Sequence, residues 1–133
     1  MIEHIHIYNQ DHQTRLTRAY SDITHLKNIE ENYNLYRDIV YTEKNILIRQ
    51  RFAGISVLFV VSSDENEFYI IELIKKYILI LNLYFHRVCE LHLKLNVREC
   101  YLLLDHFILG GFCIETDENV VVERVKEIYN LKA

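Results

Sequence analysis

The chain has 133 residues, of which half are hydrophobic, with a formal net charge of −4, no proline and three cysteines. This length is enough for one domain with one core, so we expect residues 1–133 to form a single domain. Acidic and basic residues are interleaved, which argues against a nucleic-acid-binding protein with its basic face. An odd number of cysteines without a Cys-x-x-Cys pair predicts reduced thiols in a cytosolic protein. The start of the chain lacks the basic and apolar regions of a signal peptide.

The first predicted elements form a β-hairpin. Ile5 and Ile7 alternate with His and Tyr residues, which predicts a strand with two different faces. Turn-forming residues follow at 9–12, and a second strand is predicted over residues 14–20. Ser21 then fits the N-cap of a helix, because apolar residues recur at helical spacing after it.

Three further strands complete the predicted sheet. Residues 39–41 and 46–48 are apolar and flank the polar residues 42–45, which predicts a second hairpin. Residues 55–61 are almost wholly apolar and rich in β-branched side chains, which is typical of a central strand buried on both faces. The sequence therefore predicts an α+β fold with about five strands and helices that cover the sheet.

Three helices are predicted after the strands. The helix over residues 63–85 has a narrow polar stripe, although a helix on one face of a sheet needs an apolar stripe only about 100° wide. Some of the excess apolar surface could pack against a neighbouring helix of this chain, and the rest predicts packing against another chain. Asn96 and Glu99 fit a capping box at the start of the next helix, which glycines 110–111 are expected to end. Thr116 is the expected cap of the last helix.

Histidines and cysteines raise an enzymatic alternative. His4 and His6 would share one face of a strand and could chelate a metal ion, but no third ligand stands at a set spacing. Cys89 has His86 three residues before it, yet a buried structural cysteine is the simpler interpretation. Phosphate-binding loops and nucleophile motifs are absent from the sequence. We therefore expect no cofactor and no enzyme, and a small cysteine or metal enzyme remains an alternative.

Several segments together resemble a known family. Residues 84–91 read Tyr-Phe-His-Arg-Val-Cys-Glu-Leu, residues 103–111 read Leu-Leu-Asp-His-Phe-Ile-Leu-Gly-Gly, and Glu-Thr follows at 115–116. Near the start, Thr-Arg-Leu stands at 14–16 and Arg-Phe-Ala-Gly at 51–54. In this order and spacing the segments resemble the small (sigma) subunits of the heterotetrameric clathrin adaptor complexes.

The resemblance covers nearly the whole chain and implies a longin-like fold, with an antiparallel sheet flanked by helices. It implies a subunit without catalytic residues that stabilises the core of a clathrin-associated adaptor complex in vesicle-mediated intracellular protein transport. Its partners would be the large and medium subunits, and contact with clathrin and the membrane would be indirect, through these subunits. The expected location is the cytoplasm, on the cytosolic face of coated vesicles at Golgi, endosomal or plasma membranes.

The family also implies a binding site for acidic dileucine cargo signals of the form [Asp/Glu]-x-x-x-Leu-[Leu/Ile]. Arg15 stands where an arginine of the family helps to hold the acidic residue. The residues that would line the pockets for the two leucines are Ala53, Ile55, Ile78, Arg87, Val88 and Leu91. Leucine burial would give affinity at ~25 cal/mol per Å². The exposed arginine would add direction more than strength, since surface ion pairs contribute ~0–1 kcal/mol.

A second interpretation remains open within the same fold. The chain could be a longin-like subunit of another trafficking assembly, such as the coatomer zeta chain or a tethering-complex subunit. Such a subunit would be structural and would have no cargo pocket. Binding of an acidic dileucine peptide distinguishes the two.

Overall fold

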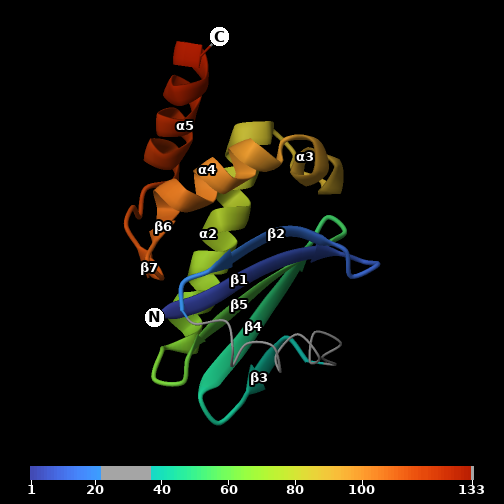
Figure 1. Ribbon diagram of the computed structural model, residues 1–133, viewed down its shortest axis with the longest axis vertical. Coiled ribbons are helices and arrows are strands. Elements are labelled where there is room, and N and C mark those ends of the chain that lie inside the picture. Colours follow the sequence, from blue (N-terminus) through green and yellow to red (C-terminus); the bar gives the residue numbers. More distant parts are fainter. Residues whose placement is uncertain (22–36, 133) are drawn as a thin grey trace.

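An antiparallel five-stranded sheet and four helices make up most of the computed structural model, which describes residues 1–21 and 37–132 (Figure 1). The strands of the sheet are β1 (Ile2–Asn9), β2 (Thr14–Ala19), β3 (Ile39–Tyr41), β4 (Asn45–Phe52) and β5 (Ile55–Ser62). The helices are α2 (Glu67–Phe85), α3 (Glu90–Leu95), α4 (Val97–Phe107) and α5 (Glu118–Lys132), and β6 (Ile108–Leu109) pairs with β7 (Phe112–Cys113). The helix expected after Ser21 falls on residues 22–36, outside the described part of the chain.

The strand order is β2-β1-β5-β4-β3, and every neighbouring pair is antiparallel. Both predicted hairpins are confirmed. The apolar strand β5 pairs with β1 on one side and β4 on the other, with Ile7 opposite Val57 and Ile48 opposite Phe59. Residues 57–61 are all buried, so the predicted central strand is also confirmed. The fold is α+β, as the sequence predicts.

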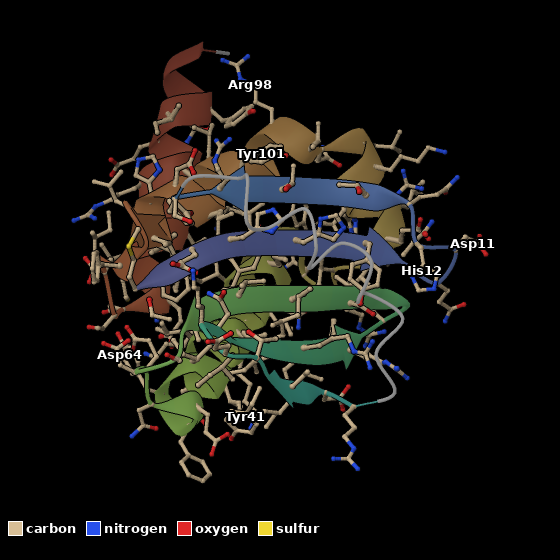
Figure 2. The ribbon with its side chains drawn as sticks, turned by 60° about the horizontal axis from the view of Figure 1, so that its bottom comes forward. Asp11, His12, Tyr41, Asp64, Arg98 and Tyr101 are labelled. Atoms are coloured by element: carbon tan, nitrogen blue, oxygen red, sulfur yellow. The ribbon has the colours of Figure 1, made fainter. Side chains whose placement is uncertain are left out.

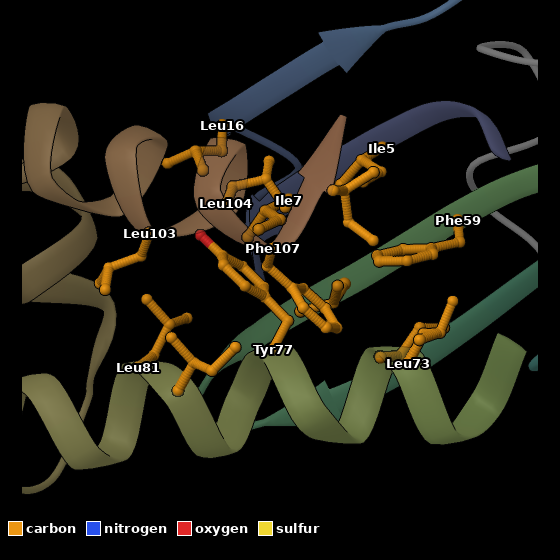
Figure 3. Close-up of a cluster of buried hydrophobic side chains, with 14 of the residues drawn as sticks. Ile5, Ile7, Leu16, Phe59, Leu73, Tyr77, Leu81, Leu103, Leu104 and Phe107 are labelled. Carbon is orange, nitrogen blue, oxygen red and sulfur yellow. The ribbon is translucent and has the colours of Figure 1, made fainter. Parts of the chain in front are cut away.

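The main core lies between the sheet and α2 (Figure 3). Phe59 from β5 faces this layer, and Tyr77 from the middle of α2 is fully buried in it. The Tyr77 hydroxyl donates a hydrogen bond to the carbonyl oxygen of Cys100 at 2.9 Å, so its polar atom is satisfied. Each fully buried side chain of this size stabilises the fold by about 1.5–3 kcal/mol. The opposite face of the sheet carries a smaller apolar cluster of Tyr8, Leu47, Leu58 and Val60.

Helix α2 begins later than the sequence predicts, at Glu67 rather than near residue 63. Asn66 is its N-cap, and its side-chain oxygen accepts hydrogen bonds from the backbone N–H groups of Phe68 and Tyr69, at 2.9 and 3.3 Å. The preceding residues form a turn in which the N–H of Glu65 donates to the carbonyl oxygen of Ser62. The amide cap, rather than the first polar residue after the strand, therefore sets the start of the helix.

The expected capping box at Asn96 is only partly correct. Asn96 does precede α4, but its side chain makes no capping hydrogen bond within the described residues. The reason is the short helix α3, which the sequence pattern did not predict: Asn96 also ends α3, and its backbone N–H donates to the carbonyl oxygen of His92 at 2.8 Å. The φ of −119° at Asn96 is not helical, as expected for a residue that ends one helix and precedes the next.

Gly110 and Gly111 do not end a helix, contrary to the prediction. Helix α4 already ends at Phe107, and the two glycines form the turn between β6 and β7 with φ values of 60° and 89°. A Cβ atom on Gly111 would lie 2.4 Å from the carbonyl oxygen of Ile2. This close approach to β1, together with the positive φ, requires glycine.

The cap of the last helix also lies one residue after the expected one. Asp117, not Thr116, caps α5, because its carboxylate accepts a hydrogen bond from the N–H of Asn119 at 2.9 Å. Helix α5 packs against α2 and α4 and points away from the sheet (Figure 1). None of the helices in the described ranges is both long enough and apolar enough to cross a membrane.

Candidate functional site

Two arginines of the edge strand β2 connect this strand to the helices. The guanidinium of Arg18 binds Asp105 of α4 with two hydrogen bonds, Nε to Oδ1 at 3.0 Å and Nη2 to Oδ2 at 2.6 Å. It also lies 4.4 Å from the ring centroid of Tyr101. The Tyr101 hydroxyl accepts from the N–H of Thr17 and donates to its carbonyl oxygen, and Figure 2 shows this side chain beside β2. Arg18 therefore belongs to a contact that closes the edge of the sheet.

Arg15 makes a different contact, with the start of α3. Its Nε and Nη2 both donate to the same carboxylate oxygen, Oε1 of Glu90, at 3.1 and 2.9 Å. Nη2 also donates to the side-chain oxygen of Gln13 at 3.2 Å. The Arg15 side chain is 18% exposed and that of Glu90 is 37% exposed. The pair thus lies at the surface, where a ligand can reach it.

Asn9 holds the other side of this carboxylate. Its amide nitrogen donates to Oε1 of Glu90 at 2.8 Å and to Oε1 of Gln13 at 2.9 Å. Its side-chain oxygen accepts from the backbone N–H groups of Asp11 and Gln13, which shapes the turn between β1 and β2. The Asn9 residue is only 5% exposed. It fixes both the hairpin turn and the position of Glu90.

The first turn of α3 is itself held in place. The backbone N–H of Cys89 donates to Nδ1 of His92 at 3.2 Å, and the His92 ring stacks on Phe85 with the centroids 4.9 Å apart. The N–H of Val88 donates to the side-chain oxygen of Asn82 in α2 at 3.0 Å. Figure 1 shows α3 near the turn that joins β1 and β2. Glu90 therefore reaches Arg15 from a fixed backbone.

The hydrogen bonds also fix the charge of Glu90. The amide of Asn9 and then the guanidinium of Arg15 lower the pKa of this carboxyl below its ordinary value, against a smaller effect of desolvation. The carboxylate is therefore ionised at neutral pH. The result is a surface cluster of one cation, one anion and two amides.

The structure brings part of the predicted cargo site to this cluster. Ile55 is paired with Asn9 in the sheet, and Val88 and Leu91 flank Glu90 in the chain. Leu91 is 58% exposed, whereas Ile55 and Val88 are core residues with 1% and 3% exposure. In this conformation the apolar residues beside Arg15 are therefore partly inside the protein.

The other predicted site residues are more spread out. Ala53 lies in the turn between β4 and β5 with a φ of 48°, and with Ile55 it lines a shallow depression of about 190 Å³. Arg87 is exposed and precedes Val88 in the connection from α2 to α3. Ile78, about two turns before the end of α2, is partly buried against the core. Their contact with a cargo peptide remains a prediction.

Sequence reasoning missed Asn9 and Glu90 as site residues. Glu90 belongs to the family resemblance, in the segment at residues 84–91, and Asn9 lies in the predicted turn at 9–12, but nothing in their spacing shows that they meet. They are 81 positions apart, and the packing of α3 beside the β1–β2 hairpin brings them together.

The metal and cysteine alternatives find little support in the geometry. Within residues 1–21 and 37–132, no group of three His, Cys, Asp or Glu side chains is placed to hold a metal ion. His4 instead lies 2.8 Å from the hydroxyl of Thr17. Burial, and then the charge of His4, lower the pKa of His6 to about 4.

The cysteine nearest to a base is Cys89, but the base is not the expected one. Its sulfur lies 3.6 Å from Nδ1 of His92 rather than near His86, which ends α2 in the left-handed conformation. That nitrogen already accepts the backbone hydrogen bond of Cys89, so the contact builds the start of α3. Burial raises the pKa of the Cys100 thiol to about 12. Neither arrangement resembles an activated nucleophile.

Comparison with known proteins gives a consistent result over the whole chain. The sequence model of the clathrin adaptor complex small chain family matches residues 1–132. The AP-2 complex subunit sigma of Schizosaccharomyces pombe is 29% identical over 143 residues, which cover 99% of this chain and all of the relative. The AP-2 complex subunit sigma of Neurospora crassa is 31% identical with the same coverage. The AP-1 complex subunit sigma-3 of Mus musculus is 26% identical over 96% of this chain and 89% of its own.

A structural match agrees with the sequence relatives. A chain in a homology model of the full-length AP-3 complex, in a stretched open conformation, has a TM-score of 0.75 and 25% identity. The match covers 98% of this chain and 95% of that chain. The relatives thus come from three different adaptor complexes.

Proposed function

Because the chain belongs to the clathrin adaptor complex small chain family, we propose that it is the small subunit of a heterotetramer with two large subunits and one medium subunit. The family match over residues 1–132 is the observation that carries this proposal. The matched relatives are named as subunits of adaptor complexes, not as enzymes. Since they come from AP-1 and AP-2 complexes alike, they do not favour one complex over another. The whole chain acts as one longin-like unit.

Exposed apolar side chains support the packing of this chain against a large subunit. On α2, Phe68 is 73% exposed and Tyr69 is 50% exposed, although both are large and apolar. Leu109 and Phe112 in the β6–β7 hairpin are 63% and 59% exposed. Tyr69 and Phe112 line the same depression, so the two groups meet at these two residues. Association with a partner removes such a surface from water.

The second role that we propose is recognition of acidic dileucine signals. Arg15 is the basic residue at the surface cluster, and it would bind the acidic residue of the signal. Leu91 is exposed beside the cluster, and Ile55 and Val88 lie just beneath the surface. The two leucines would insert against these side chains, with Ala53, Ile78 and Arg87 around them. Because Ile55 and Val88 are buried here, leucine entry requires local rearrangement.

This division of roles is chemically simple. The site binds and releases a peptide segment and makes or breaks no covalent bond. Leucine burial supplies the affinity, and the arginine supplies a preference for an acid four positions earlier. Clathrin and membrane contacts would come through the partner subunits, in vesicle formation on the cytosolic side of the membrane.

Purification of the tagged chain from its source cell tests the proposed assembly. We expect two large subunits and one medium subunit of one adaptor complex to co-purify. Coatomer or tethering-complex subunits in their place would contradict this assignment and favour the alternative trafficking role. The purified complex then allows a direct binding measurement with an acidic dileucine peptide.

A further inference from the structure

The guanidinium of Arg15 has one occupied edge and one open edge. An arginine side chain carries five N–H donors. The Nε and Nη2 edge faces Glu90 and Gln13, with three hydrogen bonds between 2.9 and 3.2 Å. Among the described residues, none accepts a hydrogen bond from Nη1. Nη1 therefore keeps N–H donors with which a cargo carboxylate could be bound while Glu90 stays in place.

Glu90 is held too firmly to be an accidental partner of Arg15. One of its oxygens, Oε1, accepts three hydrogen bonds, two from Arg15 and one from the buried amide of Asn9. The backbone that carries Glu90 is fixed by the contacts of Cys89 with His92. The hydrogen bonds to Oε1 also keep the carboxylate ionised, since they lower its pKa. The negative charge thus remains beside Arg15 when a ligand approaches.

We propose that Glu90 is a specificity-determining residue of the cargo site, because its carboxylate orients Arg15 and reduces the contribution of the acidic residue in the signal. This inference rests on the proposed recognition of dileucine peptides. Glu90 turns Nη1 toward the ligand and at the same time repels a second carboxylate on the same guanidinium. The intact chain should therefore discriminate only weakly between dileucine peptides with and without the acid.

The neighbouring pair of Arg18 and Asp105 provides a matched control. It lies on the same strand, and its carboxylate has a similar side-chain exposure, 36% against 37% for Glu90. Asp105 uses both of its oxygens on Arg18, whereas the Arg15 guanidinium is bound by Glu90 and Gln13. Asp105→Asn thus removes the same charge from the same region without changing the Arg15 contact.

The test measures peptide affinity in the purified complex, with wild type, Glu90→Gln and Asp105→Asn. Two peptides are compared, which differ only by Glu or Gln four positions before the first leucine. The amide introduced by Glu90→Gln keeps an oxygen that can accept from Arg15, so the orientation is retained while the charge is lost. We expect the ratio of affinities, Glu peptide over Gln peptide, to rise about two- to fivefold in Glu90→Gln, as the removal of one surface charge pair allows. The Gln peptide is the internal reference for each variant, and the ratio in Asp105→Asn should equal that of wild type.

The outcomes separate this inference from the proposed function. If both peptides bind wild type and the ratio in Glu90→Gln is unaltered or lower, the role of Glu90 is wrong. Equal weakening of both peptides in Glu90→Gln leaves the ratio unaltered. It would contradict the specificity role of Glu90, since it shows only that Glu90 supports the structure of α3. If neither peptide binds the wild-type complex, dileucine recognition itself fails, and this inference fails with it.

Discussion

Arg15 and Arg18 stand three positions apart on one strand, yet they make two different kinds of contact. One edge of the Arg18 guanidinium binds both oxygens of Asp105, and one face of it lies over the ring of Tyr101. Arg15 directs two of its N–H groups at one oxygen of Glu90 and a third at Gln13, and no aromatic ring among the described residues lies under its guanidinium; in that part of the chain nothing accepts from Nη1 of either arginine. Both contacts lie within the chain, but only Arg18 adds an aromatic face to a bidentate pair with one carboxylate. Our proposal assigns Arg18 to the fold and Arg15 to peptide binding.

The electrostatics of the two pairs support this distinction. The hydrogen bonds from Arg18 to Asp105 raise the pKa of that guanidinium, as expected for a bidentate pair. For Glu90, the hydrogen bond from the Asn9 amide lowers the pKa of the carboxyl most, and the hydrogen bond from Arg15 comes second. The carboxylate at the Arg15 end is thus held from two sides and does not depend on the arginine alone. A ligand can compete for part of Arg15 without dismantling the site.

Val88→Asp should have the largest effect of these variants, because it disturbs the part of the chain that holds Glu90 beside Arg15. Val88 is 3% exposed and packs in the core just before α3, so a buried charge there lacks a partner. We expect a loss of stability of about 3 kcal/mol or more, with reduced assembly into the complex. Denaturant unfolding measures it.

Leu91→Asp is the matched variant for that measurement. Leu91 is 58% exposed, so the same charge should leave stability within about 0.5 kcal/mol while it weakens binding of dileucine peptides. If both variants are equally stable, Val88 is not a core residue and the anchoring of α3 described above is incorrect.

His6→Gln tests whether the stability of the protein depends on pH through His6 of β1 rather than through the two arginine pairs. Burial lowers the pKa of His6 from 6.5 to about 4 in the folded chain, so below pH 6.5 the unfolded chain binds a proton that the folded chain does not. The contribution of His6 to stability should therefore decrease by roughly 2–3 kcal/mol between pH 6.5 and 4. The variant should lose less stability over this range in denaturant unfolding. Parallel curves for both proteins would exclude His6 as the cause.

Arg18→Ala should reduce the stability of the fold but not the choice of ligand. The Arg18 side chain is 38% exposed, so screening keeps the expected loss small, at about 1 kcal/mol. Peptide affinity and the preference for an acidic residue should remain as in wild type. A thermal or denaturant melt gives the first quantity and peptide titration of the complex gives the second. If this variant lost the preference for an acidic residue, Arg18 would belong to the binding site together with Arg15, and the distinction between the two arginines would be wrong.

The sequence predicts the sheet better than it predicts the site. Alternation in β1 and the apolar run of β5 identify strands from the sequence, although β1 is buried on both faces, with His4 and His6 only 6% and 8% exposed. Helix α3 was missed, since its six residues are too few to show a helical period. Gly110 was misassigned because a glycine pair ends helices and forms hairpin turns alike.

Less of the site can be predicted from the sequence. Arg15 was identified through the family resemblance, but its pairing with Glu90 joins residues 75 positions apart. No local pattern encodes such a pair, because it depends on how α3 is placed against the hairpin of β1 and β2. The burial of Val88 is likewise a property of packing, and an apolar residue in a motif can equally line a pocket or fill the core.

A double-mutant cycle between Arg15 and the acidic residue of a dileucine peptide tests the central distinction most directly. Affinities are measured at low salt for wild type and Arg15→Ser with the Glu and Gln peptides, and the same cycle is run with Arg18→Ala. We predict that Arg15→Ser weakens the Glu peptide by ~0.5–1 kcal/mol more than the Gln peptide, that salt reduces this coupling, and that Arg18 shows none. Zero coupling at Arg15 under these conditions would contradict the distinction between the two arginines, because Arg15 would then serve only its contact with Glu90.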